Sequence, residues 1–82
     1  MMYISMIGYL DSVRHQKNLT VEKMCDGITN PKQYYKFING LSDPSINKFE
    51  MFVTLKLEMK MSEFFILYED HLENIVSKLV TG

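Results

Sequence analysis

The chain has 82 residues, 46% of them hydrophobic and 23% charged, with a formal net charge of −1. This composition is typical of a globular protein, and the length allows one small core in a single domain over residues 1–82, with no separate catalytic lobe. A single cysteine excludes an internal disulfide. The longest apolar run is far shorter than the ~20 residues that a membrane span needs. The N-terminus lacks the basic leader of a signal peptide. We therefore expect a cytoplasmic protein.

The charge is distributed unevenly along the chain. Residues 1–41 hold five Lys and Arg against three acids, a net +2, whereas residues 42–82 hold four lysines against seven acids, a net −3. The basic half permits an anionic partner but does not require one.

The first two predicted helices lie before residue 28. Apolar residues recur at intervals of three in the first: Ile4, Ile7, Leu10 and Val13. This stripe predicts a helix that ends near the polar residues 15–18. Thr20 is a favourable N-cap for a second helix, and Gly27 is suited to end it in a left-handed turn. The apolar face of the second helix holds Val21, Met24 and Cys25.

The third predicted helix has the clearest start in the chain. Asn30 is a favourable N-cap and Pro31 a favourable first residue, so we expect a helix over 31–39 that is ended by Gly40. Spacings of three and four turn one set of side chains inward: Tyr34, Phe37 and Ile38. The opposite side of the helix carries Lys32, Gln33, Tyr35 and Lys36.

Two further helices complete the predicted fold. Ser45 is a favourable N-cap for the fourth, whose apolar residues are Phe49, Phe52, Val53, Leu55 and Leu57. The fifth is predicted over about 62–80, with a stripe at spacings of three and four: Phe65, Tyr68, Leu72, Ile75, Val76 and Leu79. No long segment alternates with the period of a strand, so the sequence predicts an all-α fold of five helices.

The second and third helices, over about residues 20–40, form a candidate helix-turn-helix. The third is expected to expose a polar, lysine-bearing face. Cys25 is a small apolar residue at the point where the two helices would cross, and we expect it to be a core residue rather than a nucleophile.

Two stretches carry a resemblance to a known family. Leu10 to Ile28, L-x-x-V-R-x-x-K-N-L-T-V-E-K-M-C-D-G-I, and Tyr34 to Ser45, Y-Y-K-F-I-N-G-x-x-x-P-S, resemble the Cro/C1-type (XRE) helix-turn-helix domains. The resemblance covers about residues 7–66, and the spacing is most similar to the DNA-binding heads of PlcR/Rgg-type regulators. It implies a lambda-repressor-like bundle and a small transcriptional regulator that binds double-stranded DNA, usually as a two-fold dimer, with helix 31–39 in the major groove.

The resemblance also implies the residues that contact DNA. Lys32 and Gln33 would face base edges. The residues implied to contact phosphates or flanking bases are Asn30, Tyr35 and Lys36 on the third helix and Arg14, Lys17 and Thr20 before it. Two positions differ from the family: Ile38 replaces the glutamate that pairs with Arg14, and Val21 replaces a glutamine that contacts phosphate. The alternative is that the lysines form an ordinary solvated helix face.

No pattern in the sequence indicates an enzyme, a metal site or a cofactor. His15 and His71 are far apart, and no cysteine or carboxylate stands at a ligand spacing from them. The rival function is a protein-interaction module that keeps a helix-turn-helix shell, for instance a phage or mobile-element antagonist of a host regulator. A third reading is the head of a longer sensor protein.

The last predicted helix is longer than a core of this size requires. Its later apolar residues, Leu72, Ile75, Val76 and Leu79, would lie in water unless a second copy covers them, which predicts a homodimer. The alternative is a monomer in which this helix packs fully along the first one.

Overall fold

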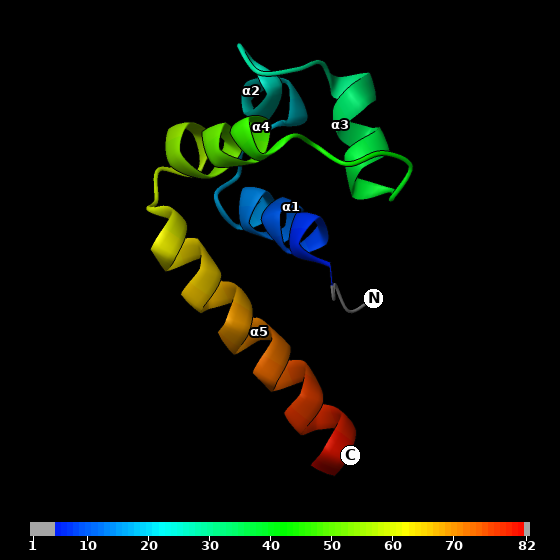
Figure 1. Ribbon diagram of the computed structural model, residues 1–82, viewed down its shortest axis with the longest axis vertical. Coiled ribbons are helices and arrows are strands. Elements are labelled where there is room, and N and C mark those ends of the chain that lie inside the picture. The colour runs from blue at the N-terminus through cyan, green and yellow to red at the C-terminus, as the bar shows by residue number, and fades with distance from the viewer. Residues whose placement is uncertain (1–4, 82) are drawn as a thin grey trace.

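A computed structural model describes residues 5–81, with side chains through residue 79, so Ile4 of the predicted first stripe lies outside the described residues. Within that range the structure consists of helices alone, in the order α1 (Met6–Gln16), α2 (Val21–Cys25), α3 (Pro31–Ile38), α4 (Ile46–Met51), the π-helical turn η1 (Phe52–Lys56) and α5 (Met61–Thr81). The predicted all-α fold of five helices is confirmed (Figure 1).

Hydroxyl and amide side chains define the starts of the first four helices. Thr20, Asn30 and Ser45 were predicted as N-caps, and each accepts a hydrogen bond from the backbone N–H three residues later, at 3.2, 2.8 and 3.2 Å. Ser5 caps α1 in the same way, from Gly8 N–H at 3.1 Å. Each cap satisfies a backbone donor that has no partner inside its helix.

Glycines in the left-handed region follow α2 and α3. Gly27 and Gly40 have φ values of 78° and 75°, as their positions after the predicted helices indicate. A side chain at either position would strain the backbone, because residues with a Cβ atom rarely adopt this conformation.

Helix α4 continues into a wider turn. Leu57 N–H donates to Phe52 O, five residues earlier, at 2.9 Å, which is the bond of a π-helix. Phe52, Val53 and Leu57 are buried, but Leu55 is 60% exposed, so its predicted place in the core is wrong. It lies two residues from both Val53 and Leu57, which puts it on the opposite side of the helix.

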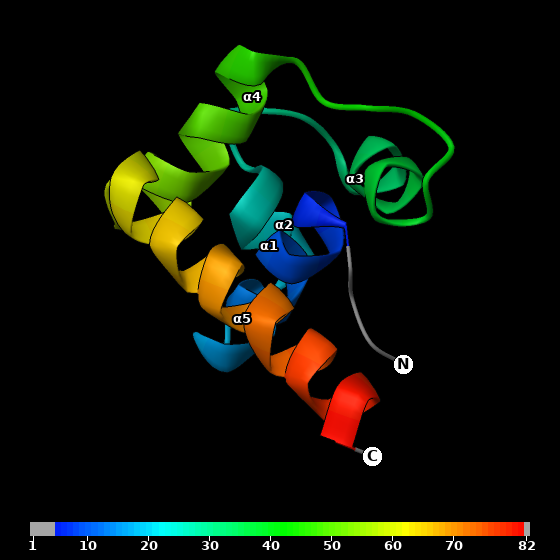
Figure 2. The same cartoon turned by 60° about the horizontal axis from the view of Figure 1, so that its bottom comes forward.

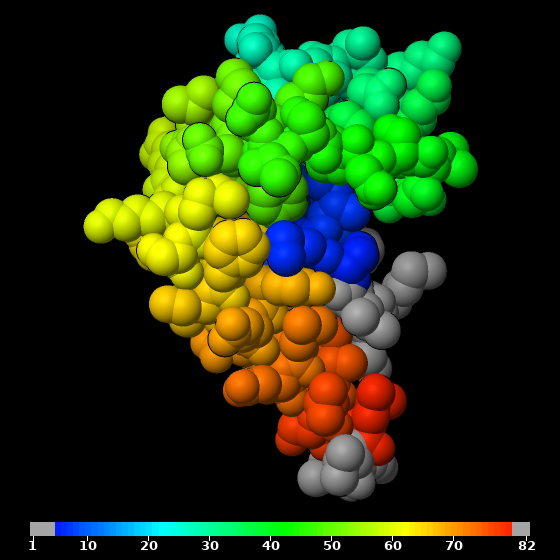
Figure 3. Space-filling model, in the orientation of Figure 1, coloured from blue at the N-terminus to red at the C-terminus, as the bar shows by residue number. Residues whose placement is uncertain are grey.

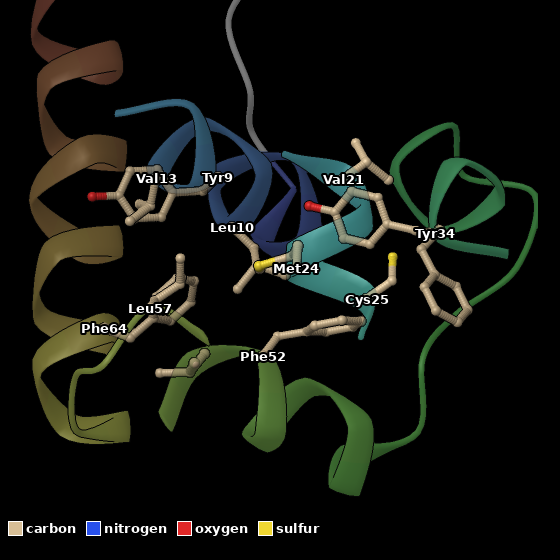
Figure 4. Packing of buried hydrophobic residues seen from close by; sticks show 12 residues of the cluster. Tyr9, Leu10, Val13, Val21, Met24, Cys25, Tyr34, Phe52, Leu57 and Phe64 are labelled. Atoms are coloured by element: carbon tan, nitrogen blue, oxygen red, sulfur yellow. The ribbon is translucent and has the colours of Figure 1, made fainter. Parts of the chain in front are cut away.

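The core is a single cluster to which α1, α2, α3, η1, the residue after η1 and α5 contribute, with Phe49 of α4 packed against it. It comprises Tyr9, Leu10, Val13, Val21, Met24, Cys25, Tyr34, Phe37, Phe52, Val53, Leu57 and Phe64. Cys25 is fully buried as predicted, although it is the last residue of α2 rather than a central one. Figure 4 shows its side chain near the rings of Tyr34 and Phe52, so α2, α3 and η1 meet around this small residue.

Helix α5 crosses α1, where its aromatic side chains meet the ring of Tyr9, and its last turns extend past the other helices (Figures 1 and 2). Phe64 is fully buried, whereas Phe65, which the sequence analysis placed on the inner stripe, is 39% exposed. Ile75 is only 8% exposed, so its predicted exposure for a dimer contact is wrong. Leu72 is half-buried, and Val76 and Leu79 are exposed. None of the helices within residues 5–81 combines the length and apolarity needed to cross a bilayer.

Candidate nucleic-acid interface

The candidate interface is the outer face of α3. Tyr34 and Phe37 are 0% and 2% exposed and fix the inner side of the helix in the core. Lys32, Tyr35 and Lys36 are exposed on the other side. The five-residue connection from α2 to α3 is held by backbone N–H groups of Ile28 and Thr29, which both donate to Cys25 O, at 2.8 and 3.0 Å.

Gln33 does not share the free face of α3. Its side chain is half-buried, and its Nε2 donates to Ser42 Oγ at 2.9 Å. This bond joins α3 to the loop that leads into α4. The prediction that Gln33 points freely outward is therefore wrong, because the loop after Gly40 folds back within reach of its amide.

Asn30, Thr20 and Lys17 are exposed at the ends of helices. Asn30 Oδ1 and Thr20 Oγ1 already accept backbone N–H groups as N-caps. Lys17 follows the last turn of α1 and lines a small polar hollow together with Lys56 and Glu58. All three side chains are accessible, but only Asn30 stands at α3, whereas Lys17 and Thr20 flank the connection between α1 and α2.

Arg14 is not a surface residue. It is 7% exposed, its Nε donates to Asp11 Oδ1 at 2.8 Å, and its Nη1 donates to Leu19 O at 2.6 Å. Its Nη2 lies 2.8 Å from His15 Nε2. The prediction that Arg14 reaches a phosphate is wrong, because its guanidinium is turned into the molecule and bound there on three sides.

Asp11 connects Arg14 to α3. Its Oδ1 also accepts a hydrogen bond from the Tyr34 hydroxyl at 2.8 Å, and the carboxyl side chain is buried. In the sequence, Asp11 stands out only as one of the three acids of residues 1–41. A usable signal was its position three residues before Arg14, since residues at this spacing are neighbours on a helix.

The electrostatics of this buried group follow from its contacts. Burial opposes the charged form of Arg14, but the hydrogen bond and charge of Asp11 outweigh it, so the pKa of the guanidinium is raised. Burial, with the negative charge of Asp11, raises the pKa of the Tyr34 hydroxyl. Arg14 therefore stays charged and Tyr34 stays a donor across the physiological range.

Within residues 5–81, no group of three or more His, Cys, Asp or Glu side chains is arranged to hold a metal ion. Burial, with the charge of Glu22, raises the pKa of the Cys25 thiol, which disfavours the reactive thiolate.

No model of a known protein family, no curated protein and no solved structure matches this chain. The likeness to XRE-type domains therefore rests on the residues quoted above and stays a prediction.

Proposed function

We propose that the protein is a small regulator that binds double-stranded DNA with α3 in the major groove. The observation that carries the proposal is the exposure of Lys32, Tyr35 and Lys36 on a helix whose other side is buried through Tyr34 and Phe37. A helix that enters a groove must present its outer side chains from a fixed position.

The buried hydrogen bonds supply that fixed position. The Tyr34 hydroxyl joins α3 to Asp11 on α1, and Asp11 in turn holds Arg14. Gln33 joins the same helix to the following loop through Ser42. Arg14 and Gln33 thus hold α3 in position, and we do not include them among the residues proposed to contact DNA.

The remaining side chains divide by chemistry. Lys32 is in the first turn of α3 and is suited to donate to guanine acceptors. Lys36 and Tyr35, one turn later, together with Lys17 and Asn30, are suited to phosphate contacts. Thr20 is exposed at the start of α2, where its hydroxyl is suited to donate to a phosphate oxygen.

One α3 covers few base pairs, so we propose that two copies bind as a two-fold dimer. Of the predicted contact residues on α5, Leu72, Val76 and Leu79 keep exposed apolar surface for it. Ile75 instead supports the single protomer, where it is already buried.

A salt series of binding to random duplex DNA tests the proposal. The affinity should fall with a log–log slope of about −0.9 per phosphate neutralised. The Lys32→Ala/Lys36→Ala variant should bind more weakly, with a slope lowered by about one unit through the lost Lys36 phosphate contact and a weaker preference for guanine through the loss of Lys32. Lys60→Ala/Lys78→Ala is the matched control, because it removes the same charge from exposed sites outside the helix-turn-helix. Equal losses in the two variants, or no binding by the native chain, would refute the proposal.

A further inference from the structure

An apolar groove opens where the first turns of α1, α4 and α5 meet. Its volume is about 510 Å³, and its apolar walls include Met6, Ile7, Ile46, Phe49, Met61 and Phe65. Figure 3 shows the start of α1 in blue, set between α4 in green and α5 in yellow and orange. A hollow of this size accommodates the apolar side chains of one face of a helix.

Two of these side chains do little for the folded core. Ile46 is 83% exposed, and Phe65, whose ring meets the buried ring of Phe64 edge-on, is still 39% exposed. They come from opposite walls, since Ile46 begins α4 and Phe65 is in the second turn of α5. Apolar side chains gathered in this way mark an interaction surface.

Acidic residues lie in the groove and on the helix faces that form it. Asp43 is one of its nine lining residues, and neither a lysine nor an arginine is among them. Glu50 follows Ile46 by four residues on α4, and Glu69 follows Phe65 by four on α5, and both are exposed. Residues four apart share a helix face, so each glutamate lies on the same side of its helix as a residue that lines the groove.

We propose that this groove binds a basic amphipathic helix of a partner protein. Apolar residues of that helix would enter between Ile46 and Phe65, and its lysines or arginines would lie beside Asp43, Glu50 and Glu69. Helix-in-groove recognition uses apolar anchors for affinity, and charge complementarity selects the partner. The site shares no residue with the proposed DNA contacts, so the inference does not depend on DNA binding.

A second copy of this chain fits the groove less well. Its α5 carries four acids against Lys78, so insertion of that helix would set its acidic residues against Asp43, Glu50 and Glu69. Like charges brought together at an interface cost free energy. A lysine-rich helix brings the opposite charge to the same apolar walls.

Two synthetic peptides of about 18 residues, or five helical turns, make the test. Both carry the same leucines on one face, with lysines elsewhere in the first and glutamates elsewhere in the second. Fluorescence anisotropy with the full chain measures their binding. The basic peptide should bind, with an affinity that falls as salt rises, and the acidic peptide should not.

Variants locate the binding in the groove. Ile46→Ser should weaken the basic peptide about tenfold, the usual effect of losing a central apolar anchor. Leu55→Ser is the matched control, because Leu55 is equally apolar and 60% exposed but lies outside the groove. Asp43→Asn should lower the salt dependence of binding, and circular dichroism checks that each variant is folded.

Preference of the native chain for the basic peptide, with an affinity weakened about tenfold in Ile46→Ser and unchanged in Leu55→Ser, supports the proposal. Equal binding of both peptides, binding of neither, or an unchanged affinity in Ile46→Ser overturns it. Self-association of the native chain that Ile46→Ser abolishes also overturns it, since a second copy would then be the occupant. DNA binding by the same variants is measured separately, so a failure of the peptide proposal can be distinguished from a failure of the DNA proposal.

Discussion

Replacing Tyr34 by phenylalanine removes one hydroxyl from the centre of the molecule and leaves the ring in place. That hydroxyl is the donor in the 2.8 Å hydrogen bond to Asp11 Oδ1, and Tyr34 is 0% exposed. A hydrogen bond to a charged group contributes about 1.5–3 kcal/mol. Asp11 Oδ1 keeps the bond from Arg14 Nε at 2.8 Å, so the loss should fall in the lower part of that range, about 2 kcal/mol.

Thermal and urea unfolding, followed by circular dichroism, measure this loss. For a domain of this length, about 2 kcal/mol corresponds to a fall in Tm of roughly 8–16 °C. Tyr35→Phe is the matched control, because Tyr35 is the next residue and is 48% exposed, so its stability should change by less than about 0.5 kcal/mol. Equal stability of Tyr34→Phe and the native chain would show that the hydroxyl does not hold α3 to α1.

Three further results are expected. Cys25→Phe should destabilise the fold by about 1–3 kcal/mol through overpacking. The native thiol is fully buried and has a raised pKa, so it should react with a thiol reagent only as fast as the chain opens. Fast labelling of the native protein would contradict this. The raised pKa of Tyr34 means that its stabilisation is complete below about pH 10 and is lost as pH rises further, because the unfolded chain then ionises first; urea titrations from pH 8 to 11 should show a steeper fall in stability for the native chain than for Tyr34→Phe. Sedimentation equilibrium should detect a dimer that Val76→Asp dissociates, whereas a monomer at all concentrations would refute dimerisation through α5.

Local signals in the sequence predicted the helix starts well. An N-cap acts on a backbone N–H three residues later, so Thr20, Asn30 and Ser45 are identified by their neighbours alone. The same holds for Gly27 and Gly40, whose left-handed conformation depends on the lack of a side chain. These features determine where α2, α3 and α4 begin and where the chain turns.

Long-range packing decided what the sequence left open. Phe64 and Phe65 are adjacent and equally apolar, and only the position of α1 against α5 decides that Phe64 is the buried one. Tyr9 of α1 packs on it with a ring distance of 5.6 Å. Spacing along α3 likewise predicts that Gln33 faces outward. The loop after α3 places Ser42 within hydrogen-bond distance of its amide, and spacing does not show this contact.

The candidate site was predicted in part for the same reason. Spacing along α3 places Lys32, Tyr35 and Lys36 outward, and the structure agrees. Arg14 was assigned to the surface through a family resemblance in which its partner is a glutamate on the third helix. Here the carboxylate that pairs with Arg14 belongs to Asp11 on α1 itself. A pattern that compares single positions does not show that a partner on one helix has been replaced by a partner on another.

This exchange leads to a last prediction about Ile38, the position where the resemblance implies the glutamate. Restoring the glutamate with Ile38→Glu should not raise the free energy of unfolding, because Arg14 is already bound by Asp11, Leu19 O and His15. Ile38 is half-buried and packs against the core, so an unpaired carboxylate there should cost about 1–3 kcal/mol.

The same substitution should behave differently once Asp11 is absent. Asp11→Ala leaves the buried Arg14 without its carboxylate, at an expected cost of about 3–5 kcal/mol. In that background Ile38→Glu supplies a new carboxylate to Arg14, so the double variant should be at least about 1 kcal/mol more stable than the sum of the single losses predicts. Urea unfolding of the four proteins gives this coupling energy. Additive losses would mean that position 38 does not face Arg14, and the proposed equivalence between Asp11 and the family's glutamate would then be wrong.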